Sequence, residues 1–512
     1  MSRINSFTRS RFTRRAFTGS LATAPFVSLA QQTGPLKARI KIDTERAIGD
    51  IDPLIYGNFA EHLGRCIEGG IFEEGSALSD RNGYRKDVLE AASRLNVTQL
   101  RWPGGNFSSN YHWKDGIGPR DQRPSRLEMA WGTVESNRFG THEFLHYSEV
   151  LKTEPYICVN LGTGSWTDAQ QWVEYVNSSA DTAMTRLRKQ NGRNEPWKVK
   201  YWGLGNEMDG PWQMGHRSAD DYGKFALEAA KLMRWTDPDI KLIAAGSSNY
   251  GAGIDWTGWN RTVLEYLRNH VDYIALHAYF GNRENNYYEF LASSKSIDHR
   301  TKITEGVINA VTDQPNARKI YIAWDEYNVW YRARGDKERG REILEERYNL
   351  EDALVVATLL NSFINNAHIV KMANMAQLVN VIAPIFTNKT GLFLQTIYYP
   401  LQLIASHSKG KSLSLFLDCP TYESKRFGPV SYLDISASYH QQELVLSVVN
   451  RHKDQPISAD FEIQDKTFTG QVDVSEVNGP DIKSENDFGK TTVQTVTKKA
   501  SASGKKLTYQ FP

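Results

Sequence analysis

Residues 201–207 read Tyr-Trp-Gly-Leu-Gly-Asn-Glu, a short apolar run that ends in an amide and a carboxylate. The same layout, an apolar run of strand length followed by polar or aromatic residues, recurs between residues 51 and 395. Amphipathic stretches with a 3.6-residue period separate these runs, which predicts alternating strands and helices. We expect strands at 55–62, 97–105, 154–164, 199–207, 241–246, 271–279, 319–328 and 369–379, and helices that include 80–95, 167–177, 220–235 and 351–366.

Eight strand–helix units over 51–395 have the size of a (β/α)8 barrel with enlarged loops, so an α/β barrel is the predicted fold of this region. A doubly wound open sheet is the alternative. After residue 396 short alternating strands are separated by polar turns, which predicts a β-sandwich of the jelly-roll type over 396–512. Residues 31–50 contain a further alternating stretch, LKARIKIDT at 36–44, which we expect to add an N-terminal strand to that sandwich.

The first 30 residues contain five arginines and no acidic residue, and they end with small residues, Ser28 and Ala30, at the two positions that a signal peptidase reads. This is the layout of an export signal, and residues 13–17 (TRRAF) resemble a twin-arginine pattern. The sequence therefore predicts an exported protein, periplasmic or extracellular, with a signal peptide over 1–30. A disordered basic tail is the alternative. No run of 18 apolar residues occurs, so no membrane contact is expected after export.

The composition excludes several other classes of protein. The chain has 512 residues with 40% hydrophobic and 23% charged side chains, enough to build a globular core. A formal net charge of +2 argues against a nucleic-acid partner. The three cysteines, Cys66, Cys158 and Cys419, are too few and too far apart for a disulfide framework.

Two glutamates follow apolar runs on predicted strands four and seven, Glu207 and Glu326. In an eight-stranded barrel these strands lie roughly opposite each other, so the two side chains face one pocket at the C-terminal end of the strands. A facing pair of carboxyl groups is the equipment for hydrolysing a glycosidic bond, provided that one is protonated and the other ionised. Burial and like-charge repulsion would supply that difference in pKa.

Aromatic and amide side chains surround this pair in the predicted pocket. Tryptophans offer flat apolar faces to sugar C–H groups, and amides bond sugar hydroxyl groups. His62 and His277 flank the pocket and are interpreted as hydrogen-bonding supports for the glutamates. The tryptophans are Trp102, Trp131, Trp202, Trp324 and Trp330, and the amides are those of Asn106, Asn206 and Gln377.

Six motifs in order along the chain resemble those of glycoside hydrolase family 51, the α-L-arabinofuranosidases. They are 57–65 (GNFAEHLGR), 101–107 (RWPGGNF), 203–210 (GLGNEMDG), 276–279 (LHAY), 324–330 (WDEYNVW) and 373–380 (ANMAQLVN). The resemblance implies a retaining enzyme that removes terminal non-reducing α-L-arabinofuranosyl residues from arabinan- or arabinoxylan-type oligo- and polysaccharides, with Glu207 as acid/base and Glu326 as nucleophile.

The resemblance also implies sugar-binding positions, which are Glu61, Asn106, Asn206, Tyr279 and Gln377, with Trp330 and Trp131 lining the same pocket. It implies no cofactor and no metal ion, and it suggests a homo-oligomer, commonly a hexamer. A retaining mechanism predicts that the two catalytic carboxyl groups lie about 5 Å apart.

Other functions remain open at this point. An endo-acting glucanase or xylanase would use the same pair of glutamates on the same barrel. Residues 142–146 (HEFLH) match the HExxH pattern of zinc metallopeptidases. A non-catalytic sugar-binding protein would not need both glutamates. A dinucleotide enzyme is disfavoured because Met208 replaces the third glycine of the GxGxxG pattern.

Overall fold

The computed structural model describes residues 36–331, 342–468 and 470–512. Eight parallel strands close into a barrel because the last one pairs with the first, Met375 lying opposite Asn58. The predicted barrel is confirmed and the open sheet is wrong. In order around the barrel the strands are β3 (Gly57–Phe59), β4 (Gln99–Trp102), β7 (Glu154–Val159), β8 (Tyr201–Leu204), β9 (Lys241–Ala244), β10 (Tyr273–Phe280), β11 (Tyr321–Val329) and β12 (Val370–Ala376).

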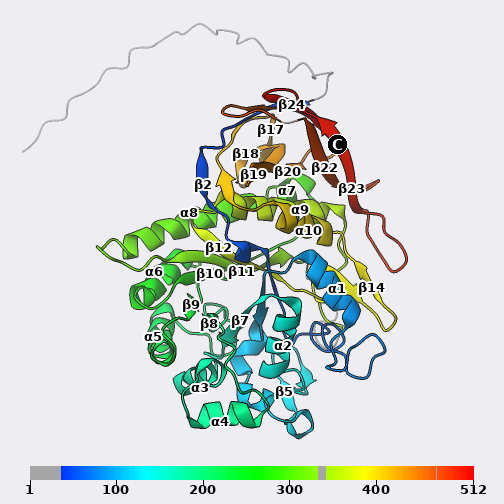
Figure 1. Ribbon diagram of the computed structural model, residues 1–512. Helices are drawn as coiled ribbons and strands as arrows, with labels where there is room; N and C mark the ends of the chain where they lie inside the picture. The colour runs from blue at the N-terminus through cyan, green and yellow to red at the C-terminus, as the bar shows by residue number, and fades with distance from the viewer. Residues whose placement is uncertain (1–35, 332–341, 469) are drawn as a thin grey trace, which may run out of the picture. The chain divides into compact units, whose positions relative to one another are not determined.

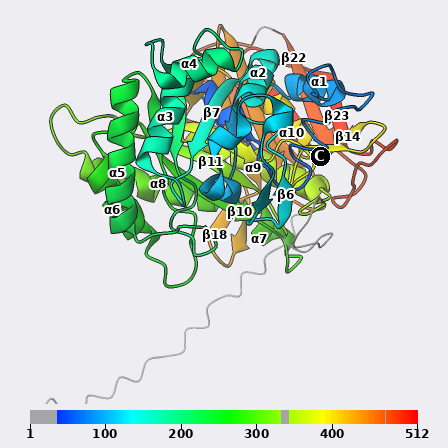
Figure 2. The same ribbon diagram turned by 90° about the horizontal axis from the view of Figure 1, so that it is seen from below.

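Helices pack around the barrel strands, as Figure 2 shows for α2, α3, α5, α6 and α8. Ser218 begins α5 by accepting a hydrogen bond from the Asp221 N–H, and Ser165 begins α3 in the same way through Asp168. None of the described helices is both long and apolar enough to cross a membrane. The longer helices are α1 (Lys86–Leu95), α2 (Thr141–Leu151), α3 (Trp166–Asn177), α4 (Ala183–Gln190), α5 (Ala219–Thr236), α6 (Trp256–Leu267), α8 (Ser294–Val311), α9 (Leu350–Asn365) and α10 (Tyr398–His407), with a short α7 (Tyr287–Leu291).

The C-terminal region contains two four-stranded sheets. Strand β1 (Leu36–Ile42) lies between β16 and β21 and pairs in parallel with β21 along its whole length. Strand β2 (Ala47–Asp50) joins the other sheet, where Figure 1 shows it in blue beside the orange C-terminal strands. The predicted N-terminal contribution to the C-terminal sheets is thus confirmed. The sheets are β16 (Phe416–Asp418), β1, β21 (Ile457–Ile463) and β24 (Lys506–Phe511), and β2, β15 (Lys411–Leu413), β19 (Leu433–His440) and β20 (Glu443–Asn450).

Helix α9 joins the barrel to these sheets. Its residues are almost all buried, which fits a helix covered on every side. Asn361 donates to the Asp434 carboxylate at 2.7 Å, and Asn365 donates to the carbonyl of Ile435 at 2.9 Å. The helix that connects barrel strands β11 and β12 is therefore anchored by strand β19.

Helix α10 differs from the prediction, which expected no helix after residue 396. The Tyr398 hydroxyl donates to the carbonyl of Ala91, and Asn96 donates to the carbonyl of Ala405, so α10 packs beside α1. Pro400 lies in the first turn of α10, where no intrahelical N–H is required. The helical layer thus extends into the region predicted to be only β-strands.

Candidate active site

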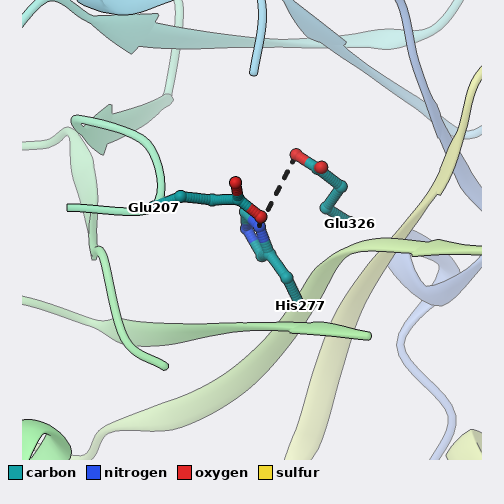
Figure 3. A group of neighbouring side chains, drawn as sticks. All are labelled: Glu207, His277 and Glu326. Carbon is teal, nitrogen blue, oxygen red and sulfur yellow. Dashed lines mark hydrogen bonds and ion pairs between the residues drawn. The ribbon is translucent and has the colours of Figure 1, made fainter. Parts of the chain in front are cut away.

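The polar residues that end the barrel strands converge at the C-terminal rim. Glu207 follows β8, while Glu326 lies on β11 and His277 on β10. One carboxylate oxygen of Glu207, one of Glu326 and one ring nitrogen of His277 all lie within 4.8 Å of one another. Figure 3 shows the three side chains approaching from different directions. All three are at least nine-tenths buried.

His277 lies among three carboxylates. Its Nδ1 is 3.0 Å from Oε1 of Glu207 and 3.6 Å from Oε2 of Glu326, and its Nε2 is 3.2 Å from Oδ1 of Asp325. Burial by itself would lower the pKa of His277, but the charge of Glu326 and the hydrogen bonds to Asp325 and Glu207 outweigh burial and raise that pKa to about 10. The ring is therefore an imidazolium at neutral pH.

The two glutamates have unlike surroundings. Burial and the charge of Glu326 raise the pKa of Glu207, which favours a protonated carboxyl group. Glu326 accepts a hydrogen bond from Nη1 of Arg101 at 2.8 Å on Oε2, and one from the Tyr279 hydroxyl at 2.8 Å on Oε1. A cation and a hydroxyl thus hold both oxygens of Glu326, an arrangement that suits an ionised carboxylate.

Asp325 lies beside both His277 and Arg101. Burial would raise its pKa, but the charge of Arg101 and the hydrogen bond from His277 lower it. The hydroxyl of Tyr156 donates to Oδ2 of Asp325 at 2.7 Å. Asp325 therefore stays ionised and keeps the cationic Arg101 and His277 in place.

Glu61 forms the other side of the site, two residues beyond β3. Its carboxylate accepts hydrogen bonds from Gln377 at 3.1 Å and from the indole of Trp131 at 3.2 Å. Burial and the charge of Glu326 raise the pKa of Glu61 to about 8. Gly105 makes room for this group, because a Cβ there would lie 2.5 Å from Oε2 of Glu61.

The remaining predicted residues lie on the same rim. The Trp330 ring packs against the edge of Tyr279 with centroids 5.2 Å apart. Asn206 precedes Glu207 and accepts a hydrogen bond from Arg101. Asn106 begins a 3-10 helix at the end of β4 and is half-buried, with no hydrogen bond from its side chain to another described residue. The structure therefore gathers the predicted sugar-binding residues at one end of the barrel. Three tryptophans that were predicted to line the pocket do not do so, because their fully buried rings pack against the outer helices: Trp102 and Trp202 contact Trp172 on α3, and Trp324 donates to the hydroxyl of Thr301 on α8.

Comparison with known proteins identifies the family. The α-L-arabinofuranosidase 1 domain matches residues 91–300, and the α-L-arabinofuranosidase C-terminal domain matches residues 325–512. An intracellular exo-α-(1→5)-L-arabinofuranosidase 1 of Bacillus subtilis is 44% identical over 82% of this chain and 86% of its own length. A thermostable GH51 α-L-arabinofuranosidase of Thermotoga petrophila superimposes with a TM-score of 0.86 at 38% identity, covering 93% of this chain and 98% of that structure. The chain belongs to the family 51 α-L-arabinofuranosidases.

Family membership confirms the predicted family, and with it a glycoside hydrolase of the α-L-arabinofuranosidase type. A fungal relative, the α-L-arabinofuranosidase C of Emericella nidulans, is 39% identical over 95% of this chain and 97% of its own length. The endo-acting glucanase or xylanase, the sugar-binding protein and the dinucleotide enzyme are thereby replaced by an arabinofuranosidase.

The predicted export of this arabinofuranosidase is wrong. The B. subtilis relative and two further bacterial relatives, 39% and 38% identical, are named intracellular enzymes. Residues 1–30, on which the prediction of a twin-arginine signal rested, lie outside the described residues.

The zinc alternative at 142–146 also fails in the arabinofuranosidase. His142 bonds the hydroxyl of Tyr175 at 2.7 Å, while His146 bonds the hydroxyl of Tyr84 at 3.1 Å. The carboxylate of Glu143 is held by Arg120 and Arg123, and it accepts the Gly140 N–H at the start of α2. The motif thus fixes a helix rather than a metal ion.

Within the described part of the enzyme, Glu207, His277 and Glu326 form the group whose spacing would suit metal ligands. A metal would need the lone pair of His277, which is protonated at neutral pH because its pKa is raised to about 10. Glu207 and Glu326 also already accept the hydrogen bonds described above. The donor set therefore fits a hydrogen-bonded acid–imidazolium–carboxylate group better than a metal centre.

Several residues of the site were not predicted from the sequence. Arg101 donates to Glu326, Asp325 lies against His277, and Tyr156 donates to Asp325, but none of these three residues received a role. Trp212, five residues after Glu207, donates its indole N–H to Oε2 of Glu207 at 2.5 Å. Its position in the same short loop as Glu207 is the sequence signal that could have indicated it. Of the two histidines predicted to support the glutamates, His277 does so, whereas His62 bonds Glu135 and Trp102 instead.

Proposed function

We propose that this family 51 enzyme removes terminal non-reducing α-L-arabinofuranosyl residues from arabinan- or arabinoxylan-type oligo- and polysaccharides by a retaining double displacement. Glu207 is the acid/base and Glu326 the nucleophile. The observation that carries the proposal is the approach of the two carboxylates to within 4.8 Å, combined with their unlike surroundings. Retaining glycosidases separate these groups by about 5–5.5 Å, and inverting ones by more.

In the first step Glu207 gives its proton to the glycosidic oxygen while Glu326 attacks the anomeric carbon. The bond from that carbon to the leaving group breaks, and an arabinosyl ester of Glu326 forms. The raised pKa of Glu207 suits a proton donor, and the hydrogen bonds from Arg101 and Tyr279 aim the Glu326 oxygens.

In the second step Glu207 acts as a base. Esterification removes the negative charge of Glu326, which is one of the causes that raise the pKa of Glu207. That pKa then falls, and the Glu207 carboxylate takes a proton from the attacking water. L-Arabinose leaves with its anomeric configuration retained, and the chemistry requires no cofactor.

The sugar itself is bound by the groups around this pair. Glu61, Gln377, Asn206, Asn106 and Tyr279 supply carboxyl, amide and hydroxyl groups for its hydroxyl groups, and the rings of Trp131 and Trp330 enclose it. Glu61 accepts hydrogen bonds from Trp131 and Gln377, so one carboxyl group links a pocket wall to the sugar-binding amide.

Hydrolysis of 4-nitrophenyl α-L-arabinofuranoside tests the proposal. We expect Glu326→Ala and Glu207→Ala to lose activity, and azide to restore turnover only in Glu207→Ala, because a small anion replaces the missing base in the second step. Glu149→Ala, an exposed carboxylate on α2, is the matched control and keeps activity. Full activity in either site variant would overturn the assignment.

We also propose the hexamer that the family resemblance implies. Size-exclusion chromatography with light scattering measures the mass of the assembly, and a monomer in solution would contradict this part of the proposal.

A further inference from the structure

Trp212 contacts the acid/base from the solvent side of the site. Its side chain lies in the loop between β8 and α5 and is 47% exposed. The indole Nε1 donates to Oε2 of Glu207 at 2.5 Å, whereas Nδ1 of His277 lies 3.0 Å from the other oxygen, Oε1. The two oxygens of Glu207 are therefore held by different groups, one half-exposed and one buried.

The loop fixes the indole in this position. Glu207 has a positive φ of 44°, which a residue other than glycine keeps only where its surroundings hold it. Its carbonyl accepts the Gly210 N–H at 2.8 Å, and the Gly210 carbonyl accepts the Gln213 N–H at 3.0 Å. A Cβ on Gly210 would lie 2.4 Å from Cε2 of Trp212, so the ring lies directly against the glycine.

The two hydrogen bonds leave one orientation for the Glu207 carboxyl group. An indole N–H only donates, and so does an imidazolium N–H, so neither can take the proton that Glu207 must deliver. Oε2 lies beside a half-exposed ring, which is the side from which a leaving group reaches the site. Oε1 lies on the buried side beside His277. The proton for the leaving group thus belongs on Oε2.

We propose that Trp212 is a positioning residue, whose indole N–H aims Oε2 of Glu207 at the oxygen of the leaving group. The proposal rests on the proposed acid/base role of Glu207. It implies that Trp212 matters when the leaving group needs protonation, and matters little when the leaving group departs readily as an anion.

The pH dependence has a definite sign. The groups that face Glu207 are Glu326 on β11, His277 and Tyr279 on β10, Tyr250 in the loop after β9, and Trp212. An N–H donor stabilises the ionised carboxylate and so lowers the pKa of Glu207. Removal of the N–H raises that pKa, and the basic limb of the kcat/KM profile then moves to higher pH.

The test compares Trp212→Phe with wild type on methyl and 4-nitrophenyl α-L-arabinofuranosides. Phenylalanine keeps a ring in the loop but has no N–H. We expect kcat/KM to fall roughly 10- to 100-fold on the methyl glycoside, the size expected for one hydrogen bond to a charged group, and less than about threefold on the nitrophenyl glycoside. Gly210→Ala pushes the indole away without removing it and gives the same selective loss.

Trp166→Phe is the control, because Trp166 is another exposed tryptophan on a neighbouring loop end, 40% exposed at the start of α3. It leaves both substrates unaffected. Equal losses on both substrates in Trp212→Phe and Gly210→Ala, without a shift of the basic limb, would show a merely structural role. Wild-type kcat/KM values on both substrates in Trp212→Phe and Gly210→Ala would also overturn the proposal.

Glu207→Ala, measured on the same two substrates, separates this proposal from the proposed function. A selective loss on the methyl glycoside supports Glu207 as the acid. With that loss in hand, an unselective result for Trp212→Phe overturns only the role of Trp212. An unselective result for Glu207→Ala itself overturns the acid/base assignment, and the role of Trp212 with it.

Discussion

Buried carboxylates have opposite surroundings at the two ends of the barrel: cations at the N-terminal end and other carboxylates at the C-terminal rim. At the N-terminal end Asp272 precedes β10 and is paired with three cations, Arg234 at 2.5 Å, Arg318 at 2.8 Å and Lys241 at 3.2 Å. At the C-terminal rim three carboxylates face one another, and the charge of Glu326 raises the pKa of both Glu207 and Glu61. The first arrangement stabilises the fold, whereas the second keeps protons available for chemistry.

The largest expected effect is the loss of activity in Glu326→Gln. Because the amide cannot form the glycosyl ester, we expect kcat/KM on 4-nitrophenyl α-L-arabinofuranoside to fall by at least about 10⁴-fold. The melting temperature should change little, because the amide keeps the volume of the carboxyl group and the carboxylate of Asp325 remains beside Arg101 and His277. A large drop in melting temperature with a modest loss of activity would contradict the comparison between the two ends.

His277→Gln tests the imidazolium between the carboxylates. We expect a loss on the order of 10²-fold in kcat/KM, because the acid/base loses its buried hydrogen-bond partner. His277 lowers the pKa of Glu207, so its removal raises that pKa and moves the basic limb of the pH profile upward. An unmoved basic limb, measured with methyl α-L-arabinofuranoside as substrate, would show that His277 does not act on Glu207.

Asp272→Asn is the reverse experiment at the N-terminal end. It leaves Arg234, Arg318 and Lys241 without their shared carboxylate, and we expect the free energy of unfolding to fall by about 2–3 kcal/mol, less than for a fully buried pair because Lys241 and Arg318 are partly exposed. Urea denaturation measures this change. The kcat/KM value should stay at the wild-type level. A tenfold loss of activity would contradict the conclusion that Asp272 stabilises the fold and has no part in catalysis.

The smallest expected effect concerns Glu61 and pH. Its pKa is about 8 in the folded enzyme and near 4.5 in the unfolded chain, so the folded state holds this proton more tightly. The resulting stability is fully present below about pH 4.5 and is lost as the pH rises through about 8. Between about pH 6.5 and pH 8 the free energy of unfolding should therefore decline in wild type, and this decline should be smaller by roughly 1–2 kcal/mol in Glu61→Gln. Equal declines in both proteins would contradict the raised pKa.

The strands of the barrel could be predicted because each is an apolar run with its own polar ending. Glu207 and Glu326 were found in this way, because Glu207 follows closely in the sequence after the strand that positions it, and Glu326 lies on its own strand. Their catalytic roles came from the family resemblance and remain predictions. The local sequence pattern was therefore sufficient to place a residue in the site wherever its position along a single strand determined that placement.

The remaining site residues depend on partners that are distant in sequence. Arg101 reads as one charged residue within a strand, and its partner Glu326 comes 225 positions later. The 142–146 motif has the spacing of any two residues on one helix face, and only the tertiary partners Tyr175 and Tyr84 show its structural role. The contact between Trp212 and Glu207 depends on the turn at Gly210. This turn folds the chain back, so that the indole, five residues after Glu207, reaches its carboxyl group.

The pairing of β1 with β21 has a consequence for synthesis on the ribosome. Leu36 pairs with Ile457 and Ile42 with Ile463, so β1 emerges roughly 420 residues before its parallel neighbour exists. At about 5–20 residues per second, this interval lasts roughly 20–80 s. During most of that time Ala38, Ile40 and Ile42, which are buried in the finished sheet, have neither β16 nor β21 beside them. The barrel is translated in full within this interval, and the C-terminal sheets close last, around β1, the first strand in the described part of the chain.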